Sequence, residues 1–120
     1  MILVDTSVWI DHLRKTDPKL VALLASNRVS MHAMVVGELA LGSLKHRSDL
    51  LVLFNNLPRS IRASDAEVLA FIESQSLWSR GLSLVDAHLL ASSLITPDTA
   101  LWTRDKRLRQ AASALGVASM

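Results

Sequence analysis

Short apolar runs alternate along this chain with longer stretches in which apolar residues recur at helical spacing. Residues 2–4, Ile-Leu-Val, form a wholly apolar run that is typical of a strand buried on both faces. We expect further short strands at residues 28–32, 60–63 and 99–102. Helices are expected between them, over residues 6–13, 18–24, 34–41, 48–56, 64–78, 85–95 and 105–115.

Capping residues support several of these helices. Asp17 and Pro18 form a helix start, with an N-cap acid and a proline in the first turn. Ser64 and Glu67 have the spacing of a capping box, and Gly116 closes the last helix. Strands that alternate with helices predict an α/β fold, with a short central parallel sheet flanked by helices on both faces. We expect one domain over residues 1–120, because this length leaves no room for a second core.

The amino-acid composition excludes several kinds of chemistry and of location. The chain has no cysteine, which excludes disulfides, thiolate zinc sites and cysteine nucleophiles. Asp5 interrupts the first apolar run, unlike a signal peptide, and the longest apolar run, residues 50–54, is too short to span a bilayer. We therefore expect a cytoplasmic protein that does not associate with membranes.

The eleven carboxylates can be sorted by position. Seven have ordinary explanations as helix-start, turn or exposed helix residues: Asp11, Asp17, Asp49, Asp65, Glu67, Glu73 and Asp98. Of the other four, Asp5 and Asp105 each follow the carboxyl end of an expected strand, where ligands bind in open parallel sheets. Each of these two acids could instead cap the helix that follows it.

The remaining two acids lie on helices. Glu38 shares an expected apolar stripe with Met34, Val35, Leu41 and Gly42, so it needs a cation, a proton or a metal; a salt bridge to an arginine is the alternative. Asp86 opens a helix, where the helix dipole alone could explain an acid. All four candidates offer oxygen ligands, which suit Mg²⁺ or Mn²⁺. Isolated histidines are more often structural, so His32 and His88 are left outside the site.

Four sequence blocks resemble a known family. MILVDTSVWIDHLR, VVGELALG, LVDAHLLAS and LWTRDKRL, in this order, resemble the VapC branch of the PIN-domain ribonucleases over nearly the whole chain. The resemblance implies a PIN-like fold and an acidic catalytic site, which maps onto Asp5, Glu38, Asp86 and Asp105. By the same resemblance, Thr6 and Thr103 are the polar neighbours of these acids.

The resemblance also implies a homodimer and a VapB-like antitoxin that blocks the acidic site. Two departures are small: Ala33 stands where relatives often have proline, and the glycine-rich approach to Asp86 is reduced to residues 80–83. Trp9, Leu13 and Leu41 could line a groove for the antitoxin, although core packing is the alternative, especially for Leu41.

These residues suggest a mechanism. Asp5, Glu38 and Asp86 would hold the principal ion, and Asp105 would complete a second site or orient the attacking water. The formal charge is only +2, but residues 104–109 carry four basic residues against one acid. Such a run is ordinarily a solvated helix face. Beside these acids, it predicts that Arg104, Lys106 and Arg107 hold the RNA backbone.

Two other classes of protein remain open. A receiver-like signalling domain would also be a short, magnesium-binding α/β fold, but its acceptor aspartate would follow a buried middle strand. The candidate segment, residues 60–65, is too polar for that strand. A non-catalytic PIN-fold module, acting with an antitoxin in repression, is the third possibility, and the intact set of four acids weighs against it.

Overall fold

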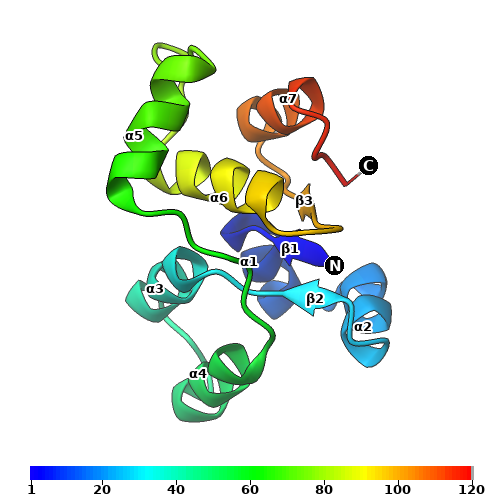
Figure 1. The fold of residues 1–120 in the computed structure, drawn as a ribbon. Helices are drawn as coiled ribbons and strands as arrows, with labels where there is room; N and C mark the ends of the chain where they lie inside the picture. Colours follow the sequence, from blue (N-terminus) through cyan, green and yellow to red (C-terminus); the bar gives the residue numbers. More distant parts are fainter. Residues whose placement is uncertain (120) are drawn as a thin grey trace.

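Three short parallel strands form the centre of the molecule, in the order β2-β1-β3. The computed structural model describes residues 1–119, with β1 at Ile2–Val4, β2 at Val29–Ser30 and β3 at Ala100–Trp102 (Figure 1). In the register, Leu3 of β1 lies opposite Ser30 on one side and Leu101 on the other. Since the strands are parallel, their carboxyl ends meet at one edge of the sheet, where Asp5 and Thr103 begin the following segments.

The connections between the strands are helical. Two helices join β1 to β2, four join β2 to β3, and one follows β3: α1 (Thr6–Arg14), α2 (Pro18–Ala25), α3 (Ala33–Leu41), α4 (Arg47–Asn56), α5 (Asp65–Ser74), α6 (Leu84–Ile95) and α7 (Lys106–Ala114). The crossover from β1 to β2 and the crossover from β2 to β3 run in opposite directions across the sheet. Right-handed connections therefore place their helices on opposite faces of the sheet, which confirms the predicted α/β architecture.

Single bridges extend both edges of this sheet. Met31, just past β2, pairs with Arg59, and Leu101 of β3 pairs with Ala118. The strand expected at residues 60–63 is therefore wrong: within residues 1–119 this part of the sheet holds only the bridge at Arg59. The chain leaves the edge because the Ile61 N–H donates to the Thr96 hydroxyl at 2.9 Å instead of to a strand.

One helix boundary also differs from the expectation. Helix α5 ends at Ser74, whereas the sequence pattern predicted a helix to about Trp78. Ser76 takes a left-handed conformation with φ of 52°, which breaks the helix. The Leu77 N–H then donates to the Ile72 carbonyl at 3.0 Å, and the turn brings the Leu77 side chain into the core.

The core lies on both sides of β1. Leu3 and Val4 are fully buried, and they share one hydrophobic cluster with Leu89 and Leu90 of α6 and with Trp9 of α1. Helix α6 lies against β3, and its residues 87–93 are all buried. Because α1 and α6 are both held by this core, the residues at their amino ends have defined positions beside the sheet edge. Within residues 1–119, no helix is long and apolar enough to cross a membrane.

Candidate active site

Asp5 lies at the carboxyl end of the central strand and is almost fully buried, with an exposed fraction of 6%. It occupies the N-cap position of α1, but its side chain makes no capping hydrogen bond. Instead, Oδ2 of Asp5 accepts hydrogen bonds from the hydroxyls of Ser7, at 2.7 Å, and Thr103, at 2.8 Å. A buried carboxylate that does not cap its helix favours the functional interpretation of Asp5 over the capping one.

The two hydroxyls that hold Asp5 are oriented by backbone donors. The Arg104 N–H donates to Oγ of Ser7 at 3.1 Å, and the Asp105 N–H donates to Oγ1 of Thr103 at 3.0 Å. Each hydroxyl has one proton, so receiving these N–H groups leaves that proton for Asp5. The segment after β3 therefore sets the orientation of the carboxylate after β1.

Asp86 is the third helical residue of α6 and takes part in a capping box. Oδ2 of Asp86 accepts from the Ser83 N–H at 2.9 Å, and the Asp86 N–H donates to the Ser83 hydroxyl at 3.1 Å. Burial raises the pKa of the Asp86 carboxyl, and the negative charges of Asp5 and Asp105 raise it further against the lowering effect of the Ser83 hydrogen bonds. The structure thus brings Asp86 within electrostatic reach of the two strand-end acids.

Asp105 is the N-cap of α7, as the capping alternative predicted. Its Oδ1 accepts from the Leu108 N–H at 3.0 Å, and the residue is exposed. The cap does not exclude a second role, because Asp105 also acts on the pKa of Asp86. Capping fixes one oxygen of this carboxylate beside the sheet edge.

Glu38 departs from the sequence prediction. Residue 38 is exposed, and so is Leu41, with an exposed fraction of 91%, so the expected apolar stripe on α3 is wrong. Helix α3 instead buries Val35 and Leu39. Glu38 therefore lies outside the buried face of this helix. No arginine pairs with Glu38 among residues 1–119; its Oε1 accepts a hydrogen bond of 2.6 Å from the hydroxyl of Thr6.

The four acids share one pattern of hydrogen bonding. Each has one oxygen held by a donor, and within residues 1–119 the other oxygen has no hydrogen-bond partner. The free oxygens are Oδ1 of Asp5, Oε2 of Glu38, Oδ1 of Asp86 and Oδ2 of Asp105. Carboxylates that are oriented through one oxygen and free at the other have the arrangement that metal ligands require.

The donor set fits a hard divalent cation. All the free atoms are carboxylate oxygens. Burial, and to a smaller extent the negative charges of Asp5 and Asp105, raise the pKa of Asp86, and a bound cation would oppose both effects. Across residues 1–119, no three His, Asp or Glu side chains converge closely enough to surround an ion directly. Mg²⁺ commonly binds through only one or two carboxylates and several waters, so this spacing suits it better than a closed cage.

The basic residues after β3 have different surroundings, as Arg104, Lys106 and Arg107 show. The guanidinium of Arg104 forms ion pairs with Asp11, at 2.7 Å, and with Asp17. Arg107 packs over Gly81, where a Cβ atom would approach Nη1 of the arginine to 2.6 Å. Gly81 also has a φ of +73°, so both its conformation and its lack of a side chain serve this contact. Lys106 is exposed and forms no ion pair within the described chain.

An open groove of about 930 Å³ leads away from Glu38. It lies between α1 and the α3–α4 hairpin, and its apolar lining includes Leu13, Leu39 and Leu53. Leu13 lines this groove, as expected, and the antitoxin as its occupant stays a prediction. Trp9 does not line the groove, because its exposed fraction is 1% and its ring packs edge-on against Phe54.

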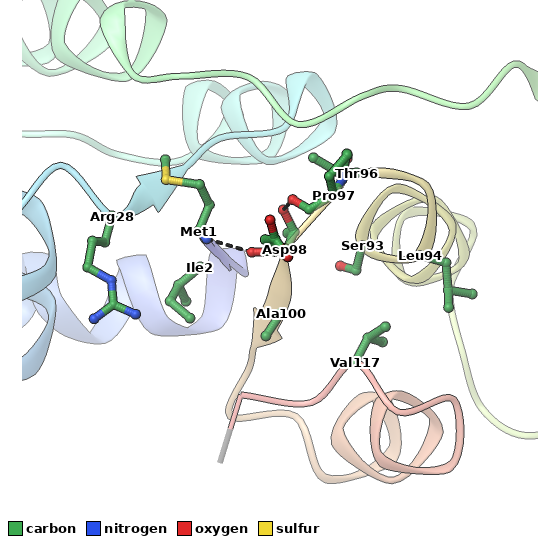
Figure 2. A pocket seen from close by; sticks show the side chains of 11 residues that line it. Met1, Ile2, Arg28, Ser93, Leu94, Thr96, Pro97, Asp98, Ala100 and Val117 are labelled. Carbon is green, nitrogen blue, oxygen red and sulfur yellow. Dashed lines mark hydrogen bonds between the residues drawn. The ribbon is translucent and has the colours of Figure 1, made fainter.

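Leu41 is the third residue that was expected to line a groove or pack in the core. Its exposed fraction of 91% contradicts core packing, and it is absent from the groove lining. A second hollow, of about 510 Å³, lies at the opposite end of the strands, beside Met1 and Ala100 (Figure 2). None of the four candidate acids lines this second hollow, where the Met1 ammonium donates to the Asp98 carbonyl at 2.7 Å.

The two histidines left outside the site are buried near each other, with ring centroids 6.1 Å apart. His32 is structural, since its Nδ1 accepts from the Met34 N–H at 3.0 Å and caps α3. Burial, with the charges of His88, Arg62 and Arg59, lowers the pKa of His32 to about 4. His32 is therefore a neutral core residue near neutral pH.

Sequence reasoning missed Ser7 and the partners of Arg104. Ser7 follows Thr6 in the first block, and nothing in its type or spacing distinguishes it from a surface serine. Asp11 and Asp17 had sufficient local explanations as a helix-surface acid and a helix cap. Their contact with Arg104 spans 93 and 87 residues of sequence, so no local pattern could indicate it.

The fold and site define a small α/β protein with an acidic site at the carboxyl edge of a parallel sheet. The PIN domain family matches residues 2–114. The chain is also 49% identical over 118 residues to Ribonuclease VapC32 of Mycobacterium tuberculosis, in strains CDC 1551 / Oshkosh and ATCC 25618 / H37Rv. The alignment covers 98% of this chain and 95% of each relative. The chain therefore belongs to the PIN-domain family, in its VapC-type branch.

Proposed function

We propose that this protein is a metal-dependent endoribonuclease that acts as the toxin of a toxin–antitoxin pair. Asp5, Glu38, Asp86 and Asp105 would form its catalytic site. The observation that carries this proposal is that all four acids are held through one oxygen and keep the other free. The similarity to Ribonuclease VapC32 supports RNA as the substrate class.

Mg²⁺ or Mn²⁺ would be held, directly or through bound waters, by the free oxygens of Asp5, Glu38 and Asp86, with Asp105 completing a weaker site or orienting a water. A divalent ion supplies charge neutralisation at the phosphate and an activated water near neutral pH. The protein's own contribution is orientation: Ser7 and Thr103 fix Asp5, Thr6 fixes Glu38, and the Ser83 N–H fixes Asp86. In this proposal, Thr6 and Thr103 would be the polar neighbours that the resemblance implied.

Basic residues beside the acids would hold the RNA backbone. Lys106 and Arg107 are exposed in the first turn of α7 and form no ion pairs within residues 1–119. Arg104 was expected to join them, but a phosphate would have to displace two carboxylates from its guanidinium. We therefore assign the phosphate contacts to Lys106 and Arg107.

The groove beside Glu38 is the surface we assign to a VapB-like antitoxin. It combines exposed apolar side chains, such as Leu13 and Leu53, with the acid Glu38 at one end. An antitoxin segment with an apolar anchor and an arginine would fill the groove and neutralise the acidic site together. We also propose that the toxin is a homodimer and that it acts on RNA in the cytoplasm.

A cleavage assay with the purified full-length chain tests the catalytic proposal. We expect single-stranded RNA to be cut with Mg²⁺ or Mn²⁺ present and to stay intact in excess EDTA. Asp5→Asn, Glu38→Gln and Asp86→Asn should each lower the cleavage rate by about 100-fold or more. Asp98→Asn is the matched control, because Asp98 lies at the opposite end of the sheet. Metal-independent cutting that survives all three substitutions would contradict the proposal.

The same assay separates the toxin from the non-catalytic PIN-fold module. The module would bind an antitoxin without cutting RNA under any metal condition. The receiver-like alternative is excluded by the match to the PIN domain family.

A further inference from the structure

Arg104 is anchored by three contacts to residues of α1 and to the N-cap of α2. Its Nη1 pairs with Oδ2 of Asp11 on α1 at 2.7 Å, its Nη2 pairs with Oδ2 of Asp17, and its backbone N–H donates to Ser7. We call Asp11, Arg104 and Asp17 the arginine triad. The triad joins the segment after β3 to both helices that follow β1.

The acid at one end of the triad is itself rigidly held. Oδ1 of Asp17 accepts from the backbone N–H groups of Lys19, at 2.9 Å, and Leu20, at 3.2 Å, which leaves Oδ2 for Arg104. Burial raises the pKa of Asp17, but these two N–H groups and the Arg104 guanidinium together hold it below its ordinary value. Arg104 therefore pairs with a fixed, ionised carboxylate rather than with a mobile surface acid.

The backbone of the same segment controls the acidic site. The N–H groups of Arg104 and Asp105 donate to the hydroxyls of Ser7 and Thr103, and both hydroxyls then donate to Oδ2 of Asp5. A shift of this segment would break both chains of hydrogen bonds at once. Oδ1 of Asp5 would then lose the orientation that leaves it free for a cation.

We propose that Arg104 is a positioning residue that acts through the triad to hold Ser7 and Thr103 against Asp5. This inference rests on the proposed metal site. It differs from the expectation that Arg104 contacts RNA phosphates. With two acids and one base, the triad has a net charge of −1, so it offers a phosphate little attraction.

The test measures Mn²⁺ affinity directly, by electron paramagnetic resonance of the free ion in titrations of the full chain. Arg104→Ala should weaken Mn²⁺ binding about tenfold, since loss of groups that orient metal ligands typically costs 10- to 100-fold. Asp11→Asn should weaken it in the same direction, and Arg104→Lys should retain part of the affinity. Arg109→Ala, on the exposed face of α7, should bind Mn²⁺ as the wild type does.

A second measurement distinguishes positioning from RNA contact. The salt dependence of binding to a short, labelled single-stranded RNA should keep its slope in Arg104→Ala, because no phosphate contact is lost. If Arg104 is instead an RNA contact, Arg104→Ala should flatten the slope, and Asp11→Asn should free the arginine and strengthen RNA binding. Either result would overturn the positioning role.

The outcomes also separate this inference from the metal site on which it rests. Unchanged Mn²⁺ affinity in both Arg104→Ala and Asp11→Asn overturns the positioning role and leaves the metal site intact. Failure of the wild type to bind Mn²⁺ overturns both. Circular dichroism checks the folding of each variant, and Asp11→Asn, which keeps the shape of the side chain, tests the triad if Arg104→Ala does not fold.

Discussion

The hydroxyl of Thr6 donates a hydrogen bond of 2.6 Å to Oε1 of Glu38, which links the start of α1 to the middle of α3. Thr6 directly follows Asp5, so this single contact sets the position of one acid relative to another that lies 33 residues away in sequence. Glu38 is exposed, and no packing from the core holds its carboxylate in place. The hydrogen bond from Thr6 therefore has the main role in orienting it.

Replacing Thr6 tests this relationship. Thr6→Val keeps the shape of the buried side chain and removes only the hydroxyl. Hydrogen bonds to charged groups contribute about 1.5–3 kcal/mol, so we expect cleavage to slow by roughly 10- to 100-fold. Single-turnover kinetics measure the loss. Thr99→Val is the control, since within residues 1–119 the Thr99 hydroxyl makes its one hydrogen bond to the Pro97 carbonyl, in the turn before β3. Equal rates for Thr6→Val and wild type would contradict the role of Thr6.

The raised pKa of Asp86 predicts a pH-dependent gain of stability from Asp86→Asn in the metal-free protein. A carboxyl whose pKa is raised on folding destabilises the native state when it is ionised. This destabilisation is complete above the pKa of the folded protein. It disappears as the pH falls below the pKa of the unfolded chain. Asn keeps an oxygen that can accept from the Ser83 N–H. We expect the variant to unfold at higher urea than the wild type at pH 7 and at the same urea in acid. A variant less stable at pH 7 would show that Asp86 acts only as a cap.

Lys106 and Arg107 should account for part of the salt dependence of RNA binding. Each lost phosphate contact on a single strand lowers the slope of log affinity against log salt by about 0.7. Lys106→Ala and Arg107→Ala should each flatten the slope by that amount in binding assays with EDTA present. Arg109→Ala should leave it unchanged. An unchanged slope in Lys106→Ala and Arg107→Ala would show that these residues do not contact RNA and form an ordinary solvated helix face.

Two adjacent residues of α4 provide a matched test of the antitoxin groove. Leu53 lines the groove, whereas Val52 is exposed but outside it. Leu53→Asp should lose the burial of a leucine, about 2 kcal/mol or roughly thirtyfold in antitoxin affinity. Val52→Asp should bind the antitoxin normally, and both variants should still cut RNA. Equal affinities in a titration calorimeter would place the antitoxin elsewhere.

Neutral His32 predicts a loss of stability in mild acid. Because its pKa falls from 6.5 in the unfolded chain to about 4 on folding, the unfolded state takes up a proton that the native state does not. Stability should therefore decline as the pH falls from about 6.5 to about 4, by roughly 3 kcal/mol from this group. His88, Arg62 and Arg59 all oppose protonation of His32. His32→Asn, which can still cap α3, should remove that part of the decline in urea titrations.

The sequence alone determined the strand–helix order and the candidate acids, because both follow from local signals. Alternating apolar runs and capping residues indicated the sheet and its helices, and Asp5 and Asp105 stood out because each follows a strand. The resemblance to the VapC branch could also be recognised from four short segments of the sequence. The predictions were wrong at two places. At residues 60–63 a hydrogen bond to Thr96 replaced the expected strand pairing. At the end of α5 the left-handed conformation of Ser76 ended the helix before the predicted residue.

Only the tertiary structure decided what each acid contacts. Helical spacing placed Glu38 in an apolar face, but which face of α3 is buried depends on what α1 and α6 present to it. Likewise, the basic run looked uniform until the fold brought Asp11 and Asp17 to Arg104 and left Lys106 unpaired within the described residues. Contacts between residues about 90 positions apart depend on how the whole chain packs, and no periodicity in the sequence encodes them.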